Sequence, residues 1–509
     1  MLPEHAVPAV EWKDAVRKPE AFRGKRGPMK QTAWLVQRAA LAVVLMVSFY
    51  ALALGIAAAL LLIPYEAYTN DVRLPIKITL VCVALAGTII WAVLPRFDRF
   101  VPPGPQLSAV DSPQLFEVLN GVASSTGQAM PAHVYLVNDV NAFVTQRGGI
   151  MGFGSRRVMG IGLPLMQALT VQEFKAVLAH EFGHYHAGDV SIGPWIYKTR
   201  AAIGRTIHQL GDGYVQKIFI AYGNLFLRVS HAVSRRQEFI ADEVAARAAG
   251  AGAMASALRK VHGAAVAFHR YWGAEVSPVL NSGYLPPLAS GFAKFVQVES
   301  VSANVARSIE AEEAEGQSDP YDTHPPLGER VAALKSQPQG SNGDARPAAS
   351  LLGDPQRWER RLLAASINED WARSLKPVAW DKVIETVYVP MWRQGLSENA
   401  RILSGITLTR LPFAGRFTPT GGVLGESEET ALNQLHIVNM AVSLALLDAG
   451  WTVSTSPGEE IVFRREGCEV RPFAELMGVA MGKVTPDQWA VRCVELGIDG
   501  VVLGGVAKV

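Results

Sequence analysis

The sequence predicts a mainly α-helical protein with a small β-sheet, two N-terminal transmembrane helices and a C-terminal α/β unit. Three observations carry this prediction. Two long uncharged runs lie near the N-terminus, helix-like and strand-like patterns alternate after them, and a polar stretch rich in Gly, Ser and Pro precedes the last part of the chain. A chain of 509 residues is also too long for one ordinary core, so several units of about 150 residues each are expected.

The two uncharged runs predict membrane-spanning helices between residues 39 and 94. Ala39–Ile63 contains 25 residues without a charge, and Ile78–Leu94 contains 17. At about 1.5 Å per residue the first run is long enough for a bilayer, and the second lies at the short end of the range. The alternative is a buried helical hairpin in a soluble protein. A cleaved signal peptide fits poorly, because the first run is too long and a mostly polar segment, residues 1–38, precedes it.

The basic residues before the first span predict its orientation. Residues 1–38 carry Lys13, Arg17, Lys18, Arg23, Lys25, Arg26, Lys30 and Arg38. The positive-inside tendency therefore places the N-terminus in the cytoplasm, and two spans return the chain there. We expect a multi-pass protein of the cell membrane (in a bacterium, the inner membrane) that contacts the lipid bilayer and has its later domains in the cytoplasm.

After the membrane the chain divides into three parts by composition. Residues 99–335 contain a predicted helix at 114–123 and strand patterns at 132–138 and 157–161, which form a small sheet. Residues 336–350 are expected to be a flexible linker. Residues 351–509 form a separate accessory domain with long helical patterns, a hairpin and a final helix. The net charge of +2 gives no indication of nucleic-acid binding, and three cysteines without paired spacing predict neither disulfides nor a thiolate metal site.

The stretch VLAHEFGHYHAGD has the pattern of a metal site on a helix. Thr170 and Glu173 form a capping box that predicts the start of the helix. His180 and His184 are four residues apart, so their rings project from one face and suit two nitrogen ligands of one zinc ion. Glu181 lies beside them as a candidate general base. The alternative is a polar helix that happens to be rich in histidine.

A catalytic zinc site usually needs a third protein ligand and one open position. The strongest candidates lie in SRRQEFIADEVAAR, where Glu238 and Asp242 are four residues apart on a second predicted helix. Glu238 can serve as the third ligand, and Asp242 can hold a ligand histidine through its far ring nitrogen. By itself such a pair is more often a solvated charged face. His186 lies off the shared histidine face and is a weak ligand candidate.

The segments HEFGH, RRQEFIADEVAA and DPYDTHPPLGERVAAL resemble, in order and spacing, the HtpX-type membrane metallopeptidases and the related CAAX prenyl endopeptidases. The resemblance covers roughly residues 99–335 and the preceding spans, and it implies an α+β zincin-type catalytic domain. It implies one zinc ion held by His180, His184 and Glu238, with Glu181 as the catalytic base. It also implies His324 near the scissile carbonyl, although a histidine before two prolines is otherwise an ordinary loop residue.

The same resemblance suggests supporting residues and shows one departure. Arg330, and Asn141 in the segment NAF, are expected to support the site or to bind substrate. HtpX-type proteins are expected to have two further spans between the zinc helix and the glutamate helix. Residues 187–235 contain basic residues that never leave a long apolar run, among them Lys198, Arg200, Arg205, Lys217 and Arg228. We expect amphipathic cytoplasmic helices there, with their contact to the membrane left open.

These observations predict a membrane-anchored zinc endopeptidase that acts on polypeptides. The resemblance implies misfolded membrane proteins as substrates, in membrane-protein quality control. Two alternatives remain. One is a non-catalytic scaffold whose structural zinc is closed by a fourth ligand, for which Asp189 or His186 would be needed. The other is a protease for prenylated C-termini, for which the sequence identifies no substrate.

Overall fold

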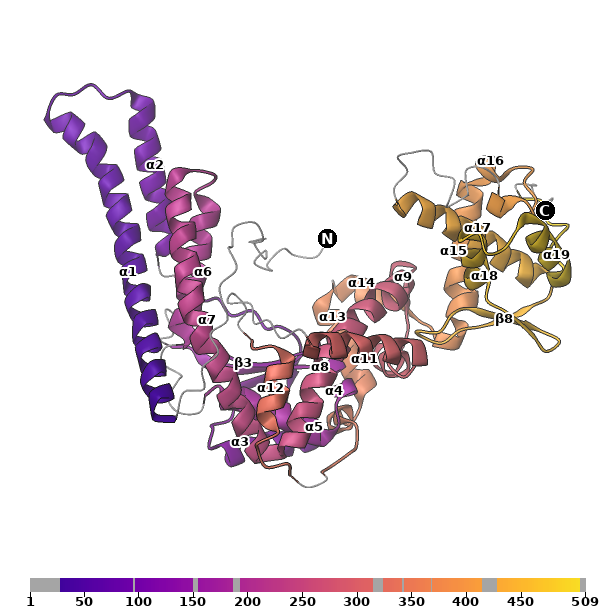
Figure 1. Ribbon diagram of the computed structural model, residues 1–509, viewed down its shortest axis with the longest axis horizontal. Helices are drawn as coiled ribbons and strands as arrows, with labels where there is room; N and C mark the ends of the chain where they lie inside the picture. The colour runs from indigo at the N-terminus through magenta and orange to yellow at the C-terminus, as the bar shows by residue number, and fades with distance from the viewer. Residues whose placement is uncertain are drawn as a thin grey trace. The chain divides into compact units, whose positions relative to one another are not determined.

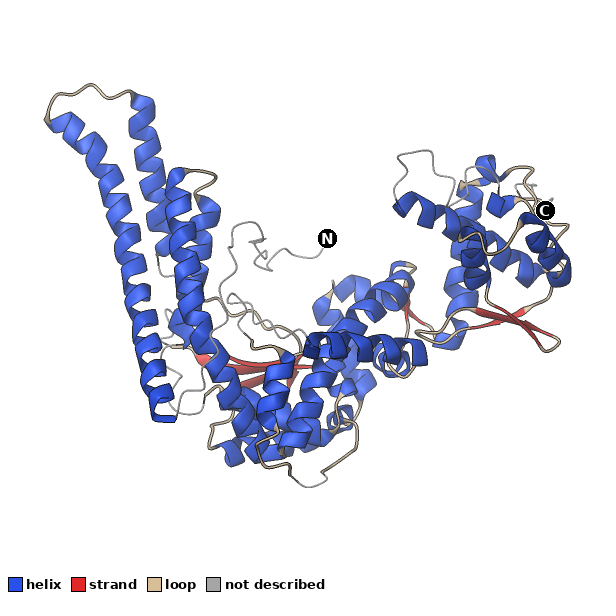
Figure 2. Ribbon diagram, in the orientation of Figure 1, coloured by secondary structure: helices blue, strands red, loops and turns tan. Residues whose placement is uncertain are grey.

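The computed structural model describes residues 28–94, 97–149, 154–185, 193–314, 324–340, 343–367, 369–413 and 428–503. These residues are mostly helical with small sheets (Figure 2), as the sequence predicts. Contacts group the chain into two compact units. Unit 1 comprises Met1–Gly263 and Arg307–Ile367, and unit 2 comprises Ala264–Ala306 and Asn368–Val509.

The two predicted spans are the helices α1 (Pro28–Thr69) and α2 (Ile76–Val93), which pack against each other (Figure 1). The stretches long and apolar enough to cross a membrane are Ala40–Thr69 and Ile76–Val93. Many large apolar side chains on both helices are exposed. Such a surface is costly in water and stable against lipid, as expected for helices of a membrane protein.

A second helical pair, α6 (Gly193–Gln209) and α7 (Tyr214–Ala249), packs against the first. Its buried apolar residues join those of α1 and α2 in one cluster, in which the Phe49 and Phe219 rings meet edge to face at 6.2 Å. The Tyr222 hydroxyl donates to the Leu45 carbonyl. The expectation of helices is confirmed for residues 193–235. One face of these helices lies on the membrane pair.

A four-stranded sheet follows the membrane helices in the chain. Its strands are β1 (Gln106–Leu107), β2 (His133–Val137), β3 (Ala142–Arg147) and β4 (Arg156–Gly162). The strand order is β1-β2-β4-β3, with β2 and β4 parallel and the other pairs antiparallel. The strand β3 therefore forms one edge of the sheet. The Phe143 ring lies over Gly160, where a Cβ would come within 2.4 Å of it.

Five helices of unit 1 lie on this sheet or pack on the helices that carry the site. They are α3 (Pro113–Thr126), α4 (Leu163–Ala168), α5 (Val171–Gly183), α12 (Leu327–Leu334) and α13 (Pro355–Ser366). The helix α5 carries the His-Glu-x-x-His segment and packs against α7 along its length. Phe174, Leu178 and Phe182 on α5 are fully buried. This apolar face fixes the helix, so its polar end is presented to α7 in one orientation.

The segment 336–350 was predicted to be a flexible linker. In the structure its described part is hydrogen-bonded to the starts of helices. The Arg346 and Asp344 carbonyls accept hydrogen bonds from the Val171 and Gln172 amides at 2.8 and 3.0 Å. The Pro338 carbonyl accepts from the Ala251 amide at 2.9 Å, at the start of α8. First-turn amides of a helix have no intrahelical acceptor. The segment therefore caps the starts of α5 and α8. A polar composition suits both this capping role and a flexible linker, so the composition alone does not separate the two.

The boundary of unit 2 also differs from the predicted accessory domain. The helices α8 (Ala251–Tyr271) and α11 (Glu299–Ala314) each cross from one unit to the other in sequence, and residues 343–367 belong to unit 1. The 3₁₀ segment η3 (Ala348–Leu352) is largely buried, with Ala348 and Leu352 almost inaccessible. That residues 351–509 form a separate domain stays a prediction.

Unit 2 contains mainly helices and a three-stranded antiparallel sheet. The strands are β7 (Thr452–Ser454), β8 (Val462–Arg465) and β9 (Cys468–Val470). The longer helices are α15 (Val389–Glu398), α17 (Glu428–Asp448), α18 (Pro472–Ala480) and α19 (Pro486–Leu496). The remaining short elements are η2 (Trp272–Val276), α9 (Ser277–Asn281), β5 (Tyr284–Leu285), α10 (Leu288–Phe295), α14 (Glu369–Ser374), β6 (Lys376–Pro377), η4 (Trp380–Lys382), η5 (Ile384–Tyr388), α16 (Ala400–Leu403) and η6 (Leu411–Phe413). The predicted hairpin is confirmed by the antiparallel β7–β8 pair.

Candidate metal centre

The predicted capping box starts α5 as expected. The Thr170 hydroxyl accepts from the Glu173 amide at 3.3 Å, and the Glu173 carboxylate accepts from the Thr170 amide at 2.8 Å. The same carboxylate accepts from the Ser256 hydroxyl at 2.6 Å and from Lys260 at 2.8 Å, both on α8. Burial would raise the pKa of Glu173, but these donors outweigh it and lower the pKa. The start of the histidine-bearing helix is thus tied to α8.

The two histidines lie at the opposite end of α5. His180 is in the last turn and is 7% exposed, and His184 is the residue that ends the helix. Their ring centroids are 4.7 Å apart at an interplanar angle of 83°. The four-residue spacing therefore places both rings at one point on the surface of α5.

Glu238 and Asp242 on α7 hold the His180 ring from its two sides. The Nε2 atom of His180 is 3.5 Å from a Glu238 oxygen, and its Nδ1 atom is 2.9 Å from an Asp242 oxygen. The Nε2 atom of His184 is 3.6 Å from the other Glu238 oxygen. Glu238 therefore faces both histidines, whereas Asp242 orients His180 through the far nitrogen.

A glycine allows the two helices to come this close. A Cβ on Gly183 would lie 2.9 Å from the Ala241 Cα atom and 3.2 Å from its Cβ atom. Ala241 is itself fully buried and is one residue from Asp242. Any larger side chain at position 183 would push α7 away from α5, and with it both carboxylates.

Arg330 of α12 neutralises one of the two carboxylates. Its Nε and Nη2 atoms donate to the two Asp242 oxygens at 2.9 and 2.7 Å, and its Nη1 atom is 3.3 Å from Glu238. All three side chains are buried. Burial would lower the pKa of Arg330, but the two carboxylates raise it. The guanidinium is therefore charged and fixes Asp242 in a bidentate pair.

Glu181 lies beside the histidines in α5. Burial raises the pKa of Glu181 to about 7, against the opposing effect of the charge on His180. A carboxylate that titrates near neutral pH can accept and return a proton.

The charges around His180 favour a cation. Burial raises the pKa of Glu238 and of Asp242, but contacts with the histidines and with Arg330 outweigh it and lower both values. Two buried carboxylates then face one guanidinium. In the absence of a metal, these carboxylates overcome the effect of burial and raise the pKa of His180 to about 9, whereas burial lowers that of His184 to about 4. A proton on His180 therefore occupies the place that a bound cation can take.

The donor set fits a zinc ion. His180, His184 and Glu238 each offer one possible ligand atom, and these three atoms lie within 4.8 Å of one another. One Glu238 oxygen is buried and makes no hydrogen bond of good geometry among the described residues, although the Arg330 Nη1 atom lies 3.3 Å from it. Two imidazoles and one carboxylate are a common set for a catalytic zinc ion, and the contact between Asp242 and His180 is the usual support for a ligand histidine.

The other residues predicted for the site differ in whether they lie near the candidate ligands. The Nδ1 atom of His324 lies 3.2 Å from a Glu238 oxygen, and this side chain is 61% exposed. It therefore lies at the open side of the site. Asn141 precedes β3 and its carbonyl accepts from the Gly162 amide at 2.8 Å. Among the described residues its side chain contacts none of the candidate ligands. His186 and Asp189 lie outside the described residues.

Sequence reasoning missed three contributors to the site. Gly183 was read only as part of the histidine pattern, although its lack of a side chain sets the distance between α5 and α7. Val144 acts through its backbone carbonyl, which accepts from the Tyr185 hydroxyl, and backbone atoms carry no residue-type signal. Tyr185 donates from its hydroxyl to the Val144 carbonyl at 2.9 Å. Its position directly after His184 was the signal that could have drawn attention to it.

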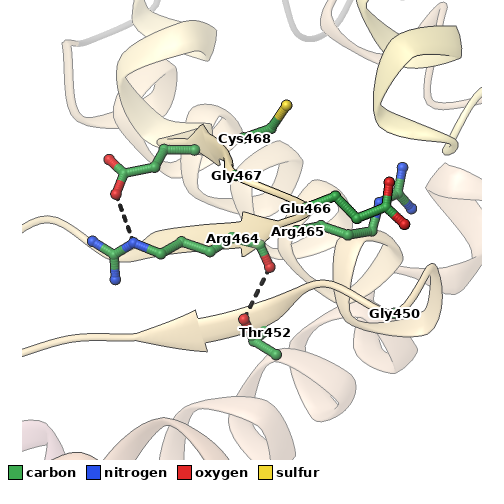
Figure 3. A pocket seen from close by; sticks show the side chains of 8 residues that line it. Gly450, Thr452, Arg464, Arg465, Glu466, Gly467 and Cys468 are labelled. Carbon is green, nitrogen blue, oxygen red and sulfur yellow. Dashed lines mark hydrogen bonds and ion pairs between the residues drawn. The ribbon is translucent and has the colours of Figure 1, made fainter.

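A hollow in unit 2 is lined by residues of β7, β8 and the turn to β9 (Figure 3). Its arginines are already engaged. Arg464 pairs with Glu469 at 2.6 Å, and Arg465 donates to the Ala449 carbonyl at 3.0 Å and stacks over the Trp451 ring. The polar groups of this hollow thus satisfy one another, and it lacks the convergent donors of the histidine site.

Comparisons with known proteins agree with this geometry. Residues 109–337 match Peptidase family M48. The chain is 24% identical over 250 residues to a protease HtpX homologue of Tropheryma whipplei (strain Twist), covering 45% of this chain and 74% of the relative. It is 26% identical over 255 residues to an HtpX homologue of Pelotomaculum thermopropionicum, covering 45% and 78%. No solved structure matches the chain.

The buried Arg330 pair makes a prediction for stability. Arg330→Gln leaves two buried carboxylates facing each other without their counter-charge, and breaking such a pair typically costs about 3–5 kcal/mol. We expect the free energy of unfolding of the metal-free, detergent-solubilised protein to fall by about that amount in denaturant titrations. Arg247→Gln, which breaks an exposed pair with Glu243 on the same helix, should change it little. Equal stability of the two variants would contradict the assigned burial of the Arg330 pair.

Proposed function

Because residues 109–337 belong to peptidase family M48, whose HtpX-type members are this chain's relatives, we propose that the chain is a membrane-anchored zinc endopeptidase. The observation that carries the proposal is the convergence of His180, His184 and Glu238 on one point, with Glu181 beside it. The helices α1 and α2 anchor the catalytic domain in the bilayer.

In the proposed mechanism each residue has a separate task. A zinc ion held by His180, His184 and Glu238 would polarise the peptide carbonyl and make water a better nucleophile at neutral pH. Glu181, whose pKa burial raises to about 7, takes a proton from the attacking water and passes it to the leaving amine. Asp242 holds the His180 ring, and Arg330 holds Asp242. His324, whose exposed side chain contacts Glu238, would meet the substrate carbonyl.

Two other functions are less well supported. A structural zinc site would be closed by a fourth protein ligand, and the described residues offer a cluster of three such ligands. A prenyl-protein protease needs a pocket for a lipid chain, and the described residues around the histidines present charged and polar groups. Polypeptide substrates, among them misfolded membrane proteins, fit a peptidase site on a membrane-anchored domain. We therefore propose a role in membrane-protein quality control.

The first test removes the base and keeps the metal ligands. Glu181→Gln conserves size and hydrogen bonding but cannot take a proton. General acid–base catalysis contributes about 10²–10⁴-fold, so we expect at least about a hundredfold loss of casein cleavage. The zinc content should stay at the wild-type level. Glu243→Gln, on α7 and away from the site, is the matched control and should cleave normally. Wild-type turnover in Glu181→Gln would overturn the proposed mechanism.

The second test separates the two carboxylates of α7. Glu238→Ala removes a proposed ligand and should lose most of its zinc as well as its activity. Asp242→Ala removes the support of His180, which typically costs about 10–100-fold in affinity or activity. It should therefore bind zinc at saturating concentration and work poorly. Zinc titrations of both variants beside Glu243→Ala decide the matter. Full zinc affinity in Glu238→Ala would move the third ligand elsewhere, with Asp242 and Asp189 the first places to look.

The third test concerns the proposed cytoplasmic position of the catalytic domain. In a background lacking the exposed Cys468, single cysteines are placed at Arg73, between α1 and α2, and at Gln114, at the start of α3. An impermeant thiol reagent should label Arg73→Cys in intact cells and Gln114→Cys only after permeabilisation. The basic residues before α1 are the physical reason. Labelling of Gln114→Cys from outside would reverse the topology.

A further inference from the structure

The two histidines of the candidate metal centre are held in different ways. His180 lies in the last turn of α5, and its Nδ1 atom is 2.9 Å from an Asp242 oxygen. His184 is the residue at which α5 ends, and its side chain is 30% exposed. Among the described residues, no side chain forms a hydrogen bond or an ion pair with its Nδ1 atom. A ligand histidine is usually oriented by a group at its far nitrogen. The orientation of His184 therefore depends on the chain around it.

Tyr185, the next residue, is fixed by groups of unit 1 outside α5. Its hydroxyl donates to the Val144 carbonyl of β3 at 2.9 Å, and its own carbonyl accepts from the Gln128 side-chain amide at 3.3 Å. The guanidinium carbon of Arg157, on β4, lies over its ring at 4.3 Å from the centroid. Arg157 also donates to the Ala129 carbonyl at 3.1 Å, which fixes the guanidinium. The sheet and the loop after α3 thus hold both the ring and the backbone of Tyr185.

The hold on Tyr185 reaches His184 through the end of the helix. The Tyr185 amide donates to the Phe182 carbonyl at 3.0 Å, and the His184 amide donates to the His180 carbonyl at 3.2 Å. Helix ends fray because their last backbone hydrogen bonds open most easily. The contacts of the Tyr185 ring, hydroxyl and carbonyl oppose this opening at the turn that carries His184.

We propose that Tyr185 is a positioning residue that holds the end of α5 so that His184 is in place before zinc binds. The inference rests on the proposed function, in which His184 is a zinc ligand. A ligand that is ordered in advance gives tighter binding, because binding does not have to supply the cost of ordering it. Tyr185 thus contributes to metal affinity through the backbone of the adjacent residue.

The test is Tyr185→Phe, which keeps the ring and its contact with Arg157 and removes only the hydroxyl. Zinc must then order the end of α5 itself, at a cost no larger than the lost hydrogen bond. The Kd for zinc, measured by competition with a chelator, should therefore rise by about three- to tenfold. Turnover at saturating zinc should stay close to wild type, because the loaded site has the same ligands.

Tyr271→Phe is the matched control, because it removes a buried hydroxyl that donates to the Leu288 carbonyl at 2.8 Å in unit 2. Its zinc affinity should equal that of wild type. Wild-type affinity in Tyr185→Phe, or a loss of turnover that excess zinc does not restore, would overturn the proposal.

Hydrogen–deuterium exchange gives a second readout that does not depend on turnover. In the zinc-free protein, the peptide that contains Phe182–Tyr185 should exchange faster in Tyr185→Phe than in wild type and in Tyr271→Phe. At saturating zinc this difference should disappear. A difference of the same size with and without zinc would mean that the hydroxyl stabilises the fold only, and the positioning role would be wrong.

His184→Ala separates this inference from the proposed function. It removes a proposed ligand and should lose most of the bound zinc. If it does so while Tyr185→Phe binds zinc as tightly as wild type, the positioning role fails and the zinc site stands. Wild-type zinc affinity in His184→Ala would instead remove His184 from the proposed site.

Discussion

The site depends on the His180 ring being held between two carboxylates of one helix. Glu238 faces its Nε2 atom and Asp242 faces its Nδ1 atom, and both come from α7 because they are four residues apart. Arg330 neutralises Asp242, so one negative charge is left over in a buried place. That excess attracts a proton onto His180 or a divalent cation into the space between the histidines and Glu238. The same arrangement thus explains the shifted pKa values and would favour a bound metal ion.

The helix α7 links this arrangement to the membrane. Its first half contributes Phe219, Phe226 and Val229 to the apolar cluster with α1 and α2, and its second half carries Glu238 and Asp242. From Phe219 to Asp242 the helix rises roughly 35 Å. A continuous helix transmits its position rigidly along its axis. The packing of α7 on the membrane pair therefore also sets where the carboxylates meet α5, where Gly183 allows close approach.

Much of this could be predicted from the sequence, for physical reasons that differ between residues. Helical spacing alone places His180 and His184 on one face, and the Thr170–Glu173 capping box marks the start of α5. To predict that Glu238 joins the histidines, a chemical argument was needed: two protein ligands are too few for a catalytic zinc ion. The segment 336–350 was misjudged because a composition typical of linkers also suits the capping of helix N-termini, and only the fold shows which amides it meets. The contact of Val144 with the Tyr185 hydroxyl is made by a backbone carbonyl, which leaves no trace in residue type.

The central claim is that His180, His184 and Glu238 hold one zinc ion with a fourth position open. The most direct measurement is a crystal structure of the zinc-loaded protein with anomalous scattering recorded at the zinc edge. The account predicts one peak at about 2.0–2.2 Å from a nitrogen of each histidine and from a Glu238 oxygen, with a non-protein fourth ligand. A zinc ion bound by four protein side chains, or bound away from Glu238, would contradict it.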